Sequence, residues 1–80
     1  MGNNTPKELK MKLGVNLRRI RKYKNYTLRQ LGVRTGLDHS DISKIERGIR
    51  TDVTIQTVIK LAAALEVSLD DLVLKDLSQK

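Results

Sequence analysis

The chain has 80 residues, of which 39% are hydrophobic, two are aromatic (Tyr23 and Tyr26) and none is cysteine. A chain of this length buries only about 60% of its extended surface, so it forms one small domain and cannot be a large enzyme. Without cysteine, and with His39 as its single histidine, it has no disulfide framework and no zinc finger. The absence of a long apolar segment or a signal peptide predicts a soluble, cytoplasmic protein.

The net charge of +7 is unevenly divided along the chain. Residues 1–50 contain 13 Lys and Arg against 4 acidic residues, whereas residues 51–80 contain 3 against 5. A basic first part next to a weakly acidic second part fits a surface that faces a polyanion, joined to a part with another role. Solubility alone is the competing explanation, so charge by itself does not decide.

Helix boundaries are marked by capping residues. A Ser, Thr or Asp that is followed three residues later by an acidic or amide side chain, with apolar residues flanking the turn, predicts a helix start. Five starts are predicted, at Thr5, Thr27, Asp38 (with Asp41 as its capping-box partner), Thr54 and Ser68. Left-handed residues that end helices are predicted at Asn25, Gly36 and Gly48.

Apolar residues recur at helical spacing between these marks and predict a helical core. One stripe contains Leu9, Leu13, Leu17 and Ile20, and another contains Ile55, Val58, Leu61, Ala62 and Leu65. Gly14 costs a helix on the order of 1 kcal/mol against alanine, so residues 5–13 form either part of the first helix or a separate short helix or frayed arm. We therefore divide the chain into residues 1–12 (a basic arm or an extension of the first helix), 13–74 (the domain) and 75–80 (a tail).

The second and third predicted helices, near 28–35 and 39–47, are joined by only three residues. Such a short connection forces the helices to cross steeply, which is the spacing of a helix-turn-helix. Gly32 allows the two helices to approach closely, and Gly36 makes the turn. Leu31, Leu37, Ile42 and Ile45 are expected to point inward and fix the angle.

These residues resemble the phage repressor and Cro-like helix-turn-helix family of the xenobiotic response element type. The resemblance rests on Thr27-Leu28-Arg29-Gln30-Leu31-Gly32, Gly36-Leu37-Asp38, Asp41-Ile42-Ser43-Lys44-Ile45-Glu46-Arg47-Gly48 and the run 58–68, within about residues 13–74. It implies an all-α, five-helix, lambda-repressor-like domain that binds DNA, regulates transcription as a dimer on two-fold operators and has no catalytic activity. It also implies an ion pair between Arg21 and Glu46 that holds the first helix against the third; two unrelated surface charges are the alternative.

In this fold the third helix lies in the major groove, and its outward side chains are His39, Ser40, Ser43, Lys44 and Arg47. Lys44 can donate to guanine, and the serines suit several bases or a bridging water. The resemblance favours His39, Ser40 and Lys44 as base readers and Arg47 as a phosphate contact. Asp41 is either a structural cap, which we favour, or an acceptor from cytosine.

Phosphates are expected to meet the start of the second helix at Thr27 and Arg29, and the loop residue Arg50. Relatives often have glutamine where Leu28 stands, so one side-chain contact is missing. The loop at 49–53 lacks the proline common in relatives and is one residue longer, which puts the position of Arg50 in doubt. The cations on the first helix, Arg18, Arg19, Lys22 and Lys24, are more often solvated surface than contacts.

One recognition helix covers too few base pairs to find a site among millions of competitors, so we expect a homodimer with recognition helices about 34 Å apart on a palindrome. Its interface is predicted at the apolar residues Leu69, Leu72, Val73, Leu74 and Leu77. A monomer with a well-filled core is the alternative.

Other functional classes fit the sequence less well. An enzyme would need convergent acid, base or metal groups, and neither His39 with Ser43 nor Asp70 with Asp71 has the partners for this. Membrane attachment would need a Trp or Phe as an anchor, which the basic helix lacks. We expect no metal, cofactor or small-molecule effector. The serious rival is a helix-turn-helix module, such as an antitoxin, that acts mainly through a protein partner, either a toxin or polymerase.

Overall fold

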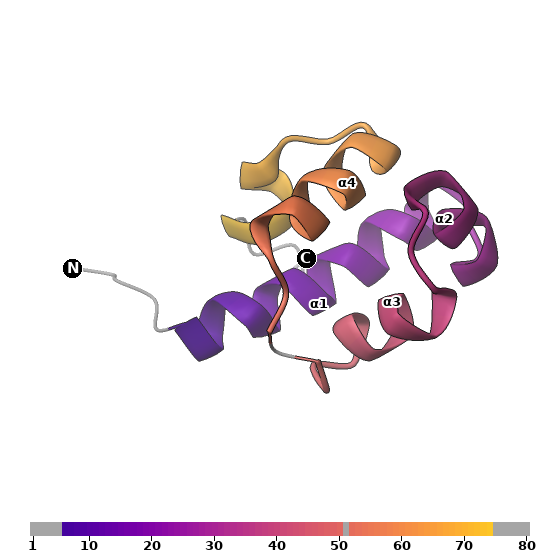
Figure 1. Cartoon of the computed structure of the whole chain (residues 1–80). Helices are drawn as coiled ribbons and strands as arrows, with labels where there is room; N and C mark the ends of the chain where they lie inside the picture. Colours follow the sequence, from indigo (N-terminus) through magenta and orange to yellow (C-terminus); the bar gives the residue numbers. More distant parts are fainter. Residues whose placement is uncertain (1–5, 51, 75–80) are drawn as a thin grey trace.

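The structure is a computed structural model that describes residues 6–50 and 52–74 of the chain. Its helices are α1 (Pro6–Tyr23), α2 (Leu28–Thr35), α3 (His39–Glu46), α4 (Ile55–Leu65) and η1 (Asp70–Leu74), a single π-helical turn. In Figure 1 the long α1 runs through the molecule, with α3 on one side and α4 with η1 on the other. The predicted five-helix, all-α fold is confirmed across the described residues, none of which lies in a strand.

Most predicted helix starts coincide with the observed N-caps. Thr27 accepts from the amide of Gln30 (3.0 Å), and the Gln30 side chain accepts from the Thr27 amide (2.9 Å), which completes a capping box. Thr54 caps α4 and the Ser68 hydroxyl accepts from the Asp71 amide (3.0 Å), whereas Thr5 lies outside the described residues. Local sequence therefore sets where these helices begin.

The predicted capping box between Asp38 and Asp41 is wrong in its second half. Asp38 caps α3 by accepting from the amide of Ser40 (2.9 Å). The carboxylate of Asp41 turns instead toward Arg50, whose Nη1 lies 3.4 Å from it. The cation of Arg50, in the next loop, attracts this carboxylate away from the helix start. A capping pattern considers only the residues of the first turn, so it could not predict this ion pair.

Helix ends follow the predicted left-handed positions. Asn25, Gly36 and Gly48 have φ angles of 63°, 78° and 74°. The residue that ends α4 was not foreseen, because Glu66 adopts φ 60° although it carries a β-carbon. Its amide donates to carbonyls of the last turn of α4, which would otherwise lack partners.

The core is a single cluster of aliphatic side chains. Its most deeply buried members are Leu17, Leu31, Ile42, Leu61, Leu65 and Leu72. Ile55, which the sequence predicts to be part of this core, is 64% exposed. It is the first residue of α4, and the buried face of that helix begins one turn later, at Val58. The side chain of Leu9 lies outside the described part of the chain. No helix among the described residues is both long enough and apolar enough to cross a membrane.

Asn16 is a buried polar residue that no pattern in the sequence indicates. It lies on α1 with 1% of its surface exposed, and its Nδ2 donates to the carbonyl of Leu72 (3.1 Å) in η1. A buried amide without a partner would be costly, so this hydrogen bond fixes η1 against α1.

α1 and α3 approach each other closely at Gly14. α1 continues through this glycine without a break. A β-carbon here would lie 2.5 Å from the carbonyl oxygen of Ile45 and 2.9 Å from that of Glu46, closer than packed atoms can approach. The glycine therefore has a packing role that outweighs its low helix propensity, and it allows the C-terminal end of α3 to rest on the α1 backbone.

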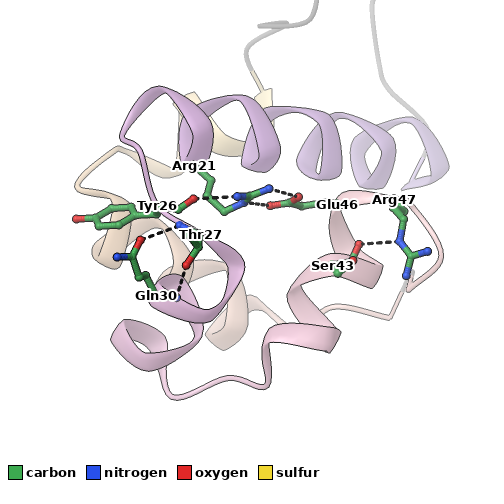
Figure 2. A network of polar contacts seen from close by, with 7 residues as sticks. All are labelled: Arg21, Tyr26, Thr27, Gln30, Ser43, Glu46 and Arg47. Carbon is green, nitrogen blue, oxygen red and sulfur yellow. Dashed lines mark hydrogen bonds and ion pairs between the residues drawn. The ribbon is translucent and has the colours of Figure 1, made fainter.

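The Arg21–Glu46 ion pair joins the same two helices (Figure 2). Arg21 Nε donates to Glu46 Oε2 (2.6 Å) and its Nη2 donates to Oε1 (3.1 Å), while Nη1 donates to the carbonyl of Tyr26 (2.8 Å). Both side chains are nearly buried, at 10% and 5% exposure. A two-point pair of this kind sets orientation as well as distance.

We expect Gly14→Ala to lower the free energy of unfolding by about 1–3 kcal/mol, because the clash with backbone outweighs the gain in helix propensity. Urea denaturation followed by circular dichroism measures the change. Arg19→Ala, at an exposed position of the same helix, is the matched control and should stay within about 0.5 kcal/mol of wild type. Unchanged or increased stability of Gly14→Ala would contradict the close approach.

Arg21→Met should lower the free energy of unfolding by about 3 kcal/mol, because it leaves the Glu46 carboxylate nearly buried without its cation. In the double variant Arg21→Met/Glu46→Leu both charges are gone, so the loss should be clearly smaller than the sum of the two single losses. The same denaturation experiment gives all three values. Additive losses would show that the two side chains are not coupled.

Candidate nucleic-acid interface

The recognition helix α3 has one buried face and one outward face. Ile42 and Ile45 are buried, while Ser40, Lys44 and Arg47 are exposed on the other side. The angle of the helix is fixed at Gly32 of α2, where a β-carbon would lie 2.9 Å from the carbonyl of Leu37. A short, rigidly held helix with its polar side outward can enter a groove without changing the core.

His39 and Ser43 are only half-exposed, at the edge of this outward face. His39 also lines a shallow hollow between α2 and α3, together with Arg29 and the exposed Val33. All four residues predicted to read bases lie on α3. Ser40 and Lys44 are exposed on its outward face, and His39 and Ser43 lie at the edge of that face. Base reading by each of them stays a prediction.

Ser40 takes part in the cap of α3. Its hydroxyl and its amide both donate to Asp38 Oδ1 at 2.9 Å. These hydrogen bonds, the one from the amide above all, lower the pKa of Asp38, because they favour the charged form of its carboxylate. Because the hydroxyl proton is engaged, Ser40 is left to meet a base or a water as an acceptor.

The phosphate candidates fall into two groups. Thr27 and Arg29 lie at the start of α2, where the Thr27 hydroxyl is used in capping and Arg29 is exposed. Arg47 lies at the end of α3, and its Nε donates to the carbonyl of Ser43 (3.4 Å), which directs the side chain back along the helix (Figure 2). The two groups lie at opposite ends of the helix-turn-helix. Contacts with the DNA backbone at both ends would fix the position of α3 on the duplex.

Arg50 is held by two carboxylates that the sequence did not connect with it. Its guanidinium lies 3.4 Å from Asp41 on α3 and 3.3 Å from Asp52 in the following loop. The pairing ties that loop to the recognition helix. A phosphate at Arg50 would have to share the guanidinium with these acids, so the predicted contact would be weaker than one with an unpaired arginine.

The predicted dimer interface needs correction at Leu72. This side chain has 0% exposure because it fills the core between α1 and η1, so it is not available to a partner. Leu69 is 40% exposed, Val73 is half-buried against the core, and the side chain of Leu74 and all of Leu77 lie outside the described residues. Other large apolar side chains are exposed on α4, namely Ile55 and Ile59.

Comparison with known proteins supports this geometry. The helix-turn-helix family model HTH_3 matches residues 17–72. The transcriptional regulator SlrR of Bacillus subtilis is 43% identical over 60 residues, which are 75% of this chain and 40% of SlrR. SinR of Bacillus subtilis is 37% identical over 60 residues, 75% of this chain and 54% of SinR. The chain thus spans about half the length, or less, of these two relatives.

Solved structures of such proteins superpose on the chain. SinR in complex with DNA has a TM-score of 0.71 at 37% identity, covering 75% of this chain and 95% of that one. A complex of SinR with SinI gives 0.76 at 32%, covering 85% and 66%. The restriction-modification controller protein C.AhdI of Aeromonas hydrophila gives 0.74 at 35%, covering 79% and 94%. The chain therefore belongs to the Cro/C1-type helix-turn-helix family of DNA-binding transcriptional regulators.

Proposed function

We propose that this protein binds double-stranded DNA in a sequence-specific manner, with α3 in the major groove, and acts as a repressor or autoregulator of transcription. The observation that carries the proposal is the polar and basic outer face of α3, held rigidly opposite the buried Ile42 and Ile45. SinR, a relative at 37% identity, has been solved in complex with DNA, which supports the same use of this fold.

The proposed contacts divide between bases and backbone. His39, Ser40, Ser43 and Lys44 read base edges, with Lys44 donating to guanine O6 and N7. Thr27, Arg29, Arg47 and Arg50 hold phosphates and set the register of the helix on the duplex. The basic charge of residues 1–50 supplies the sequence-independent part of the affinity.

The proposed active species is a homodimer on a palindromic operator, because a single α3 reads too few base pairs for useful specificity. With Leu72 committed to the core, exposed apolar side chains outside the helix-turn-helix offer the surface instead. Ile55 and Ile59 lie one turn apart on α4 and are 64% and 48% exposed, and Leu69 is 40% exposed. A second copy that covers these side chains removes them from water.

A second candidate function is binding to a protein partner, as in an antitoxin. It is favoured by the likeness to SinR in its complex with SinI. The two functions differ in their response to salt, since binding to random duplex DNA must weaken steeply as salt rises. Absent or salt-independent DNA binding would favour the protein partner.

Lys44→Ala should relax the preference for one or two base pairs, at a cost of about 1–3 kcal/mol on the preferred site only. Arg29→Ala should weaken binding to every sequence alike and lower the salt slope by about 1. Selection from a random duplex pool, followed by titration of the selected and scrambled sites, measures both. Lys60→Ala, an exposed cation on α4, is the control and should change neither. The reverse pattern for Lys44 and Arg29 would contradict the assigned roles.

Sedimentation of the full chain at micromolar concentration should show a dimer. Ile59→Glu should convert it to a monomer, because the new carboxylate would be buried at the two-fold interface. Val33→Glu makes the same change on α2, where the valine is 85% exposed, and should leave the dimer intact. A monomeric wild-type protein would exclude this mode of assembly.

A further inference from the structure

α1 carries a basic surface that the contacts proposed above do not use. Val15, Arg18, Arg19, Lys22 and Tyr23 are all exposed and follow one another at intervals of one, three or four residues, so they share the outer side of the helix. Together with Glu46 they line one shallow hollow, which we call the α1 groove. It contains three cations and a single acid.

Glu46, the acid in the α1 groove, does not neutralise the charge of these cations. Both of its carboxylate oxygens accept hydrogen bonds from Arg21. The ion pairs within the described residues join Arg21 to Glu46 and Arg50 to Asp41 and Asp52, and none of them involves a cation of the groove. The groove therefore presents a positive surface to any anion that reaches it.

The groove is continuous with the end of α3, because Glu46, the last residue of that helix, lines it. Gly14 brings the carbonyls of Ile45 and Glu46 against the α1 backbone, and Arg47 follows directly at the end of α3 (Figure 2). A polyanion that lies along the outer face of α3 and passes Arg47 thus meets the α1 groove next. This continuity favours the DNA that α3 reads over an acidic protein segment, which would have no reason to share that edge.

We propose that the α1 groove binds phosphates of the DNA backbone that flank the bases read by α3, with Arg18 and Lys22 as the contacting cations. The two side chains lie one turn apart and follow Gly14 by four and eight residues, along the side of α1 that touches Ile45 and Glu46. The inference rests on the proposed DNA binding and extends the contacted surface beyond the helix-turn-helix. Binding there is independent of sequence, because phosphates are the same at every base pair.

The test measures the affinity of the full chain for a random duplex over a series of salt concentrations. Arg18→Gln/Lys22→Gln should lower the magnitude of the log–log salt slope by about 2 per subunit, at about 0.9 per phosphate lost, while base preference in a selected pool stays as in wild type. The swapped variant Arg18→Lys/Lys22→Arg keeps both charges and should keep the slope. Lys60→Gln on α4, with one exposed cation removed, should leave the slope unchanged.

The outcomes separate the two levels of the proposal. If wild type binds DNA and Arg29→Ala weakens it, but the double variant keeps the wild-type slope, the α1 groove is not a DNA site and the proposed function stands. If wild type does not bind DNA at all, both fail. If the double variant keeps its DNA slope but loses binding to poly-glutamate, the groove serves an acidic protein segment, which also overturns this inference. Circular dichroism of each variant verifies folding.

Discussion

The contact between α1 and the C-terminal end of α3 is the constraint on which the proposed DNA-binding surface depends. Arg21 joins three segments, because from α1 it donates twice to Glu46 on α3 and once to the carbonyl of Tyr26 just before α2. Gly14 permits the backbones to touch at the same place. A nearly buried ion pair is stable only when both charges are present and well aligned, so this junction holds α3 in one orientation.

The acids around the recognition helix are all engaged within the protein. Asp38 accepts from Ser40, Asp41 faces Arg50, and Glu46 is bound by Arg21. This arrangement explains how a helix with an acidic residue before it and two within it can face a polyanion. The negative charges stabilise the helix start, the following loop and the α1 contact, and the exposed cations are left to set the potential outside.

The segregation of charge along the chain also acquires a meaning in three dimensions. The basic first part of the chain contains α1, α2 and α3, and these helices hold every proposed DNA contact except Thr27 just before α2, Arg47 just after α3 and Arg50 in the following loop. The second part supplies α4 and η1, which complete the core through Leu61, Leu65 and Leu72, and this part of the chain also carries exposed apolar side chains. One part is thus suited to nucleic acid, and the other to packing and association.

The sequence by itself determined the helix starts at Thr27, Asp38 and Thr54, the left-handed ends, the helix-turn-helix and the family. These follow from caps, turns and spacing, which act within a few residues of one another. Only the tertiary structure decided that Gly14 is a contact point, that Asn16 holds η1 and that Leu72 is core. It also decided that Arg50 meets Asp41. Each of these depends on which distant segments meet, and local patterns carry no information on that.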